Sequence, residues 1–555
     1  MKSVRRRVSA CRRFMIRLPS AALIVVFCLS AMGVAVVGPA AHLRADDKTA
    51  DVTPDKTADV TPDKTADVTP DKTADVAPEA LTDFEESWQV VYIAKSRVGY
   101  WRSTSGRTLR DGKQVVVTDI EMAMSISRFG QTAKIKTIVK TQENPDGDLI
   151  GYQYEMQNPP AMPTSATGRV DGDKLIITTE TNGLAKTKEM AWDNAIKSPN
   201  YQDRLLRENP LKPGESREFK SFDPQFSKVN TITLTAGGKE LRDVKMLDGK
   251  IRKLLEVKIT QSLVPGVSMY EYVDEQGLPL KTAVSLLQME TYTVAKQEAL
   301  KTLSGDEVDL AVATLVKTGK IDRSQQTRQV VYRISVPGED PETIVSKGFT
   351  QLITRINPNT IDLTVRAIAP PETAPENVEP PGKEFLSPNS YLQSGDELVK
   401  KHAADAVGAE TDSWKAAQLM EHYVWKNLKK KNFSTLLASA AEVAKDLSGD
   451  CTEHAVLLAA MCRARGIPSR VAVGLVYVPS LSSFGGHMWT EVFEKGTWIP
   501  LDATLGKGGI AADHIKFADS SFSDDGDSTP ITAFLPMVSA LGKMKIEVRE
   551  VTHDK

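Results

Sequence analysis

The stretch Gly449–Tyr477 reads GDCTEHAVLLAAMCRARGIPSRVAVGLVY and contains the signals of one helix and one strand. Ser448 or Asp450 can cap a helix whose first turn holds Cys451, and a glycine and a proline after the apolar run end that helix. The run Arg470–Val478 is apolar and rich in β-branched residues, which predicts a buried strand. The start and stop signals agree, so we predict a helix followed by a strand.

Two further strands are expected after this unit. The segment GGHMWTEVF (485–493) ends in an alternating pattern, and Thr497–Leu501 is the expected return strand. If Phe493–Gly496 is a four-residue turn, His487 lies directly opposite Asp502 on the same face of the hairpin. A three-residue loop would place the two side chains on opposite faces.

Cysteine, histidine and aspartate in this arrangement suit nucleophilic catalysis, as nucleophile, general base and orienting group. The positive end of the helix dipole is expected to favour the thiolate of Cys451. Cys462 lies among apolar neighbours on the same helix and is expected to be a buried hydrophobe. Eleven residues along a helix span about 16 Å, so the two cysteines are too far apart for a disulfide.

These motifs carry a resemblance to a known family. The stretch GDCTEHAVLLAAMCRARGIPSRVAVGLVY, followed by GGHMWTEVF and GTWIPLDAT, resembles the transglutaminase-like superfamily of papain-type cysteine enzymes. The resemblance covers Trp414 to His514 and implies an α+β core. It also implies that Cys451 is the nucleophile, His487 the base and Asp502 the orienting residue. The backbone N–H of Cys451 is one expected oxyanion donor, and the second is not assigned.

A metal site is the competing interpretation. His454 lies three residues after Cys451 on the same helical face, so Cys451, His454 and His487 resemble a three-ligand set. The spacing lacks the CxxC pattern of common zinc sites, and this set would leave Asp502 without a role. Animal members of the family often use calcium, but no EF-hand-like acidic loop is present. We therefore predict neither a metal nor another cofactor.

Several neighbouring residues are expected to have structural roles. His454 and His514 are interpreted as structural groups, and Trp489 as a residue that packs the sheet or walls the cleft. Glu453 and Glu491 are expected to be solvated or ion-paired rather than catalytic.

The charge of the chain is unevenly distributed. The 555 residues include 70 basic and 72 acidic ones, for a formal net charge of −2. Residues 1–45 contain eight basic residues and no acidic one, whereas residues 46–78 carry a net −5. Because the basic charge is concentrated in one terminal stretch, no nucleic-acid partner is expected.

Residues 1–45 have the pattern of an export signal or an N-terminal membrane anchor. Basic residues extend to Arg17, and the uncharged run Leu18–Leu43 follows. The length of this run also suits a single membrane span. We therefore expect an exported protein of the periplasm or cell envelope, either anchored by this segment or released when it is cleaved.

An eight-residue repeat follows the head of the chain. DKTADVTP occupies Asp47–Pro54 and recurs three times, with one change in the last copy. Repeats this short and polar do not stack into a solenoid, so residues 46–81 are interpreted as a disordered linker. A spacer at this place favours the anchor over the cleaved signal.

The rest of the chain is predicted to be multidomain. Short alternating runs separated by turn signals such as Asp111-Gly112 predict a mainly antiparallel β-rich domain at 82–303 and a smaller β domain at 304–369. A Pro-rich linker is expected at 370–395, before the α+β transglutaminase-like (papain-like) domain at 396–555.

The sequence therefore predicts an exported, cysteine-dependent acyl-transfer enzyme that acts on amide bonds of proteins or peptides through a thioester. Hydrolysis is favoured because water is always abundant and no amine-binding site can be identified. The alternatives are a protein cross-linking transglutaminase and, from a different class, a non-catalytic envelope interaction protein.

Overall fold

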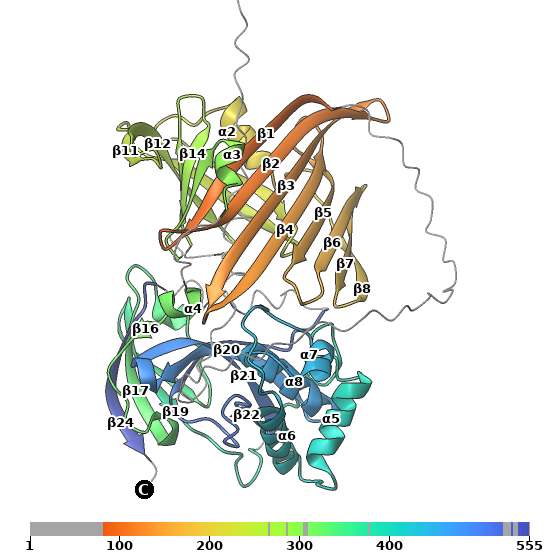
Figure 1. Ribbon diagram of the computed structural model, residues 1–555, viewed down its shortest axis with the longest axis vertical. Coiled ribbons are helices and arrows are strands. Elements are labelled where there is room, and N and C mark those ends of the chain that lie inside the picture. Colours follow the sequence, from red (N-terminus) through yellow and green to blue (C-terminus); the bar gives the residue numbers. More distant parts are fainter. Residues whose placement is uncertain are drawn as a thin grey trace, which may run out of the picture.

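The structure is a computed structural model with two main parts, a β-rich N-terminal half and a mixed C-terminal half (Figure 1). It describes residues 81–264, 267–284, 287–302, 309–375, 378–524, 534, 536 and 542–553. The predicted export segment (1–45) and all but the last residue of the repeat linker (46–81) lie outside these residues. Within the described ranges, no helix combines the length and apolar character that crossing a bilayer requires.

The N-terminal β-domain, residues 82–294, is built on one antiparallel sheet. Strands β1 to β8 follow one another across the sheet, and β15 to β12, then β10 and β9, continue it on the other side of β1. The strands are β1 (Thr82–Ile93), β2 (Ser96–Arg110), β3 (Lys113–Arg128), β4 (Gln131–Glu143), β5 (Leu149–Gln157), β6 (Thr164–Asp171), β7 (Lys174–Thr181), β8 (Leu184–Ala191), β9 (Ser216–Asp223), β10 (Lys228–Ala236), β11 (Arg242–Lys245), β12 (Ile251–Gln261), β13 (Met269–Val273), β14 (Pro279–Val284) and β15 (Met289–Val294).

Local sequence explains the hairpins of this sheet. Asp111 and Gly112 both have positive φ, 54° and 72°, and they join Arg110 to its partner Lys113 in a two-residue turn. Such turns match the twist of the paired strands. Along β3, every second side chain from Val116 to Ile126 is buried, as expected for a strand with one covered face. The predicted antiparallel β-rich architecture is confirmed.

The sheet curls, and a short segment joins its two distant parts. The backbone N–H of Lys197 donates to the carbonyl of Lys220 in β9, and the N–H of Phe222 donates back to the carbonyl of Lys197. The next N–H, of Ser198, donates to the carbonyl of Gly147 just before β5. Helix α2 (Tyr201–Glu208) follows this segment.

In its described residues, the C-terminal region (309–553) combines two antiparallel sheets with four main helices. One sheet has the order β16-β21-β20-β23 with β22 beside β21, and the other has the order β18-β19-β17-β24. The strands are β16 (Val316–Lys317), β17 (Thr327–Ser335), β18 (Gln351–Asn357), β19 (Thr360–Arg366), β20 (Ser469–Val478), β21 (Ser483–Glu494), β22 (Thr497–Leu501), β23 (His514–Ser520) and β24 (Lys545–His553). The main helices are α5 (Glu397–Val407), α6 (Ser413–Asn427), α7 (Ala440–Asp446) and α8 (Cys451–Ala464).

Short helical turns complete the described elements. They are α3 (Lys296–Ala299), α4 (Leu310–Ala313), η1 (Ser324–Gln326), η2 (Pro341–Thr343), η3 (Lys383–Phe385) and η4 (Pro479–Leu481). Helix α8 packs against β20 and β21 and is surrounded by α5, α6 and α7 (Figure 1). The predicted helix and strand at 451–478 are thus present, as α8 and β20.

The prediction of a separate small β domain at 304–369 is wrong. Strand β17 pairs on one side with β19 and on the other with β24, at the C-terminal end of the chain. Strand β16 joins the sheet that contains β20 and β21. The error has a physical cause: strand patterns show which residues can pair but not which distant strand supplies the partner.

The predicted register of the hairpin at 487–502 is also wrong by two residues. The turn consists of Lys495 and Gly496 alone, both at positive φ, so Glu494 pairs with Thr497. The prediction had assumed a four-residue turn. Because a shift of two residues preserves the alternation of faces, His487 and Asp502 still lie on the same side, although not directly opposite.

One glycine allows the central sheet to form, and its substitution gives a test of the fold. A Cβ atom at Gly474 in β20 would lie 1.9 Å from the carbonyl oxygen of Ile515 in β23. We expect Gly474→Ala to lower the free energy of unfolding by about 1–3 kcal/mol, because backbone must move to admit the methyl group. Chemical denaturation measures this. Gly348→Ala is the control, since its Cβ would meet no atom within 4 Å; equal stability of the two variants would contradict the expectation.

Candidate active site

Helix α8 begins at Cys451 because Asp450 caps it. The Asp450 carboxylate accepts hydrogen bonds from the backbone N–H of Thr452 at 2.9 Å and from its hydroxyl at 2.8 Å. In return, the Glu453 carboxyl accepts the N–H of Asp450 at 2.8 Å, which completes a capping box. The predicted cap at Asp450 is therefore present, and it holds Cys451 as the first residue of the helix.

The thiol of Cys451 is buried, and its state differs from the prediction. Burial raises the pKa of the Cys451 thiol well above its usual range, and the charge of Asp450 adds to the rise. The N–H of Met488, which donates to the sulfur, and the charge of Arg128 act in the opposite direction. The predicted thiolate is therefore wrong for this conformation, because loss of solvation outweighs the helix dipole.

The other two residues of the predicted set, His487 and Asp502, form a buried pair. His487 is in β21, and Asp502 directly follows β22. Nε2 of His487 lies 2.8 Å from Oδ2 of Asp502, and both side chains are 1% exposed. Nδ1 of His487 is buried and has no hydrogen-bond partner among the described residues. It is thus the ring atom left to exchange a proton.

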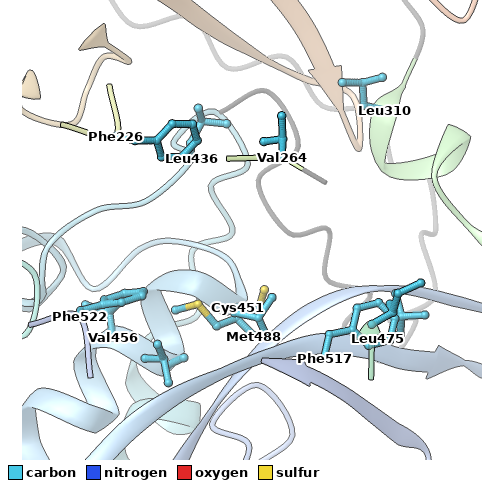
Figure 2. Close-up of a cluster of buried hydrophobic side chains, with 14 of the residues drawn as sticks. Phe226, Val264, Leu310, Leu436, Cys451, Val456, Leu475, Met488, Phe517 and Phe522 are labelled. Atoms are coloured by element: carbon cyan, nitrogen blue, oxygen red, sulfur yellow. The ribbon is translucent and has the colours of Figure 1, made fainter. Parts of the chain in front are cut away.

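Met488 links the two parts of the site. It follows His487 in β21, and its backbone N–H donates to the sulfur of Cys451. Figure 2 shows Cys451 beside Met488, with Val456 of α8 nearby, in a cluster of buried apolar side chains. The structure therefore brings all three predicted residues into one buried region, although sequence separates them by up to 51 positions.

His514 makes contacts that the sequence analysis missed. Its Nε2 lies 3.3 Å from Oδ2 of Asp502, and its Nδ1 lies 2.8 Å from Oδ1 of Asp513. Burial alone would lower the pKa of His514, but the charge of Asp513 and the hydrogen bonds to both carboxylates raise it to about 9. His514 is therefore an imidazolium at neutral pH. The Asp513-His514 pair was the available signal, and only the pairing of β20 with β23 brings it to the site.

Asp502 is the centre of this network. Burial alone would raise its pKa, but the two histidines hold the pKa of Asp502 well below its usual range. Its Oδ1 accepts the N–H of Thr504 at 2.8 Å and the hydroxyl of Thr504 at 2.6 Å. Its own N–H donates to Glu421 at 3.1 Å. The carboxylate therefore stays ionised and has one orientation.

Cys451, His454 and His487, the competing metal-ligand set, do not form a ligand cluster among the described residues. The ring of His454 is engaged with the carbonyl of Asp450, to which Nδ1 donates at 2.6 Å. Burial lowers the pKa of His454 to about 3, so the ring is neutral. Potential ligand atoms of His487, Asp502 and His514 do lie within 4.8 Å of one another. Both histidines, however, are hydrogen-bonded to the Asp502 carboxylate. The absence of a metal stays a prediction.

The two glutamates behave differently from each other. Glu491 is ion-paired with Arg470 and Lys516, at 2.7 Å in both cases, as expected. Glu453 is neither solvated nor ion-paired in the described residues, so that expectation is wrong. It is buried, and burial raises the pKa of its carboxyl to about 8.

Trp489 lies against both histidine rings. Its ring is roughly parallel to that of His487, with centroids 6.1 Å apart, and meets the ring of His514 edge-on at 5.4 Å. The indole therefore helps to fix the orientation of both imidazoles, in agreement with the expected packing role.

The charged state of His514 generates a prediction about stability and pH. We expect His514→Gln to lower the free energy of unfolding by about 1–3 kcal/mol at pH 6, because two buried carboxylates lose a cationic partner. The pKa of about 9 lies above the ordinary value of 6.5. The stabilisation is therefore complete below about pH 6.5 and is lost as pH rises through 9.

Denaturation of the wild type and the variant between pH 6 and 10 measures this difference. His422→Gln, which changes an exposed histidine of α6, serves as the control. A difference between wild type and His514→Gln that stayed constant over this range would show that the ring is neutral in the folded protein.

Comparisons with known proteins show which family the C-terminal region is similar to. Residues 400–503 match the model of the transglutaminase-like superfamily. A curated protein of Haemophilus influenzae, described only as uncharacterized, is 31% identical over 180 residues. That match covers 28% of this chain and 46% of the relative, so the chain spans about half of the relative's length.

Two solved structures are each similar to a part of the chain. One is a "putative cysteine protease" from Cytophaga hutchinsonii, with 17% identity over 41% of this chain and 86% of that chain and a TM-score of 0.24. The other is a β-barrel-like protein of a domain of unknown function from Brucella abortus, with 10% identity over 38% and 95% of the two chains and a TM-score of 0.28. These low scores carry no argument about activity. The family match, together with the cysteine, histidine and aspartate in order, identifies the C-terminal region of this chain as transglutaminase-like.

Proposed function

We propose that this protein is a cysteine-dependent acyl-transfer enzyme that hydrolyses amide bonds of protein or peptide substrates. The observation that carries the proposal is the buried His487–Asp502 pair, which is linked to Cys451 at the start of α8 through the N–H of Met488 that donates to the Cys451 sulfur. In this pair the ionised carboxylate orients the imidazole, and Nδ1 remains free to accept the thiol proton.

The first half-reaction forms a thioester. Sγ of Cys451 attacks the amide carbonyl while its proton moves to Nδ1 of His487. The C–N bond then breaks, and His487 returns the proton to the leaving amine. The backbone N–H of Cys451 is the proposed donor to the developing oxyanion, since it lies at the N-terminus of α8.

The second half-reaction releases the acyl group. Water adds to the thioester carbonyl and gives one proton to Nδ1 of His487. The C–S bond then breaks, and the proton returns to Sγ. An amine in place of water would give a cross-linked product by the same steps, so cross-linking is the alternative within the same chemistry. We favour water because it needs no binding site.

The buried thiol supports a second candidate, a non-catalytic interaction module. Cys451 is fully buried and its pKa is raised, which are also the properties of a structural cysteine. The ordered His487–Asp502–His514 network favours the enzyme, because a merely structural thiol needs no oriented imidazole. Substrate access to Sγ requires a conformation in which the side chains around it have moved apart.

Export is the remaining part of the proposal. It rests on the basic head and uncharged run of residues 1–43. Cell fractionation of the full chain tests it: the proposal expects the protein in the envelope, either with the membrane or in the soluble envelope fraction. Recovery of the protein from the cytoplasm alone would contradict it.

The sharpest test of the enzyme compares two cysteines of the same helix. We expect Cys451→Ala to abolish labelling by a thiol-directed activity probe, together with cleavage of peptide mixtures. Cys462→Ala should keep both, because Cys462 is buried mid-helix among apolar side chains. Mass spectrometry of new N-termini detects hydrolysis, and mass spectrometry of Lys-linked peptides detects cross-linking. If wild type and Cys451→Ala gave the same labelling and no products, the enzyme proposal would be wrong.

A further inference from the structure

The β-domain contributes a charged side chain to the start of the helix that carries Cys451. Arg128 is the last residue of β3, more than 300 positions before α8. Its Nη2 lies 2.7 Å from Oδ2 of Asp450, and the two side chains are 1% and 0% exposed. One oxygen of the capping carboxylate therefore accepts hydrogen bonds from the helix, and the other binds a residue of the β-domain.

The same guanidinium also holds the loop next to the site. Nη1 of Arg128 donates to the carbonyl oxygens of Phe433 at 3.1 Å and of Thr435 at 2.9 Å. This loop leads to Ala438, whose N–H donates to the Glu453 carboxyl in the first turn of α8. Arg128 thus contacts the first turn of the catalytic helix both directly and through this loop.

Neighbouring contacts also join the β-domain to the loop that Arg128 contacts. The side-chain amide of Gln131 accepts the N–H of Phe433 at 2.8 Å and donates to the carbonyl of Lys431 at 3.3 Å. The ring of Phe129 lies 5.0 Å from that of Phe433. Asn158, after β5, accepts the N–H of Leu436 at 2.6 Å. In Figure 1 the β3 and β4 ends that carry these residues face the C-terminal region.

Charge explains why this contact matters for the thiol. Asp450 directly precedes Cys451, and its negative charge opposes formation of a thiolate. The guanidinium neutralises that carboxylate at 2.7 Å. Removal of one partner of a buried ion pair leaves the other charge uncompensated, which is strongly unfavourable. Without Arg128, therefore, the capping carboxylate would be free either to turn or to act with its full charge on the neighbouring sulfur.

We propose that Arg128 is a positioning residue of the active site, so that the transglutaminase-like region depends on the β-domain for a competent nucleophile. This inference rests on the proposed function. It assigns a catalytic contribution to the β-domain, which contains none of the predicted site residues Cys451, His487 and Asp502. Arg128 acts through Asp450 and the 433–435 loop rather than by contact with substrate.

The test uses the full chain with Arg128→Gln, Arg128→Lys and one control. The control is Asn182→Ala, which removes another hydrogen bond between the same two regions, from the Asn182 amide to the carbonyl of Ser390. That bond does not touch α8 or the 433–435 loop. Thermal unfolding confirms that each variant folds before its activity is compared.

Two readouts separate positioning from general stability. The first is the pH dependence of Cys451 alkylation by iodoacetamide, followed by peptide mass spectrometry so that Cys451 is resolved from the other three cysteines. We expect Arg128→Gln to move the midpoint upward by about one pH unit, because a cation next to Asp450 is lost. We expect Arg128→Lys to remain near wild type in this readout because it retains the charge.

The second readout is steady-state kinetics on a cleaved peptide. We expect Arg128→Gln to lower kcat on the order of 10- to 100-fold with little change in KM, because the nucleophile is misplaced while substrate contacts remain. Arg128→Lys should recover part of kcat, since one ammonium cannot replace both donor groups of the guanidinium. Asn182→Ala should match wild type in both readouts.

A failure of the proposed role of Arg128 can be told apart from a failure of the proposed enzymatic function. The alkylation profile needs no enzymatic activity, so it tests the contact even if no substrate is cleaved. An Arg128→Gln protein that folds and has the alkylation midpoint and kcat of Asn182→Ala would overturn the proposal. If Arg128→Gln does not fold, Arg128→Lys decides: full wild-type kcat would overturn the proposal, and reduced kcat with an unchanged alkylation midpoint would support it.

Discussion

The arrangement of the site depends on the buried carboxylate of Asp450. One of its oxygens caps the helix that begins at Cys451, and the other binds Arg128 from the β-domain. Its backbone carbonyl accepts the ring N–H of His454, and its own N–H binds Glu453. A buried carboxylate is costly unless all of its hydrogen-bonding positions are filled. The hydrogen bonds and the ion pair of Asp450 therefore place the first turn of α8, the adjacent loop and the end of β3 relative to one another.

A second buried carboxylate organises the part of the site that contains His487 in the same manner. Asp502 lies between His487 and His514, and Thr504 holds its remaining oxygen. Buried ion pairs contribute little net stability compared with well-packed apolar groups, but a partly broken network is strongly unfavourable. The main effect of the Asp450 and Asp502 networks is thus to fix the positions of the site residues rather than to add stability. Cys451 directly follows Asp450, and burial keeps its thiol neutral. In the proposed mechanism this thiol ionises only as the reaction proceeds.

The helix at Cys451, the strand after it and the identity of the Cys451, His487 and Asp502 cluster could be predicted from the sequence. They depend on local signals, namely a cap, a stop and the alternation of faces, and on motifs short enough to recognise. The hairpin register was missed by two residues because the turn uses only Lys495 and Gly496. A shift of two residues leaves each side chain on the same face of the hairpin. The predicted contact between His487 and Asp502 is therefore present although the predicted pairing was wrong.

Local sequence signals are enough to show where the helix begins, which residue is the candidate nucleophile and which face of β21 carries His487. The presence of Arg128 and His514 at the site, and the neutral state of the thiol, follow instead from contacts made across the folded chain. The reason is physical: caps and strand alternation are set by neighbours along the chain, whereas pKa values and ion pairs depend on desolvation and on charges brought together across domains. A single arginine at the end of a β-strand has no local signature that shows which buried carboxylate it will meet.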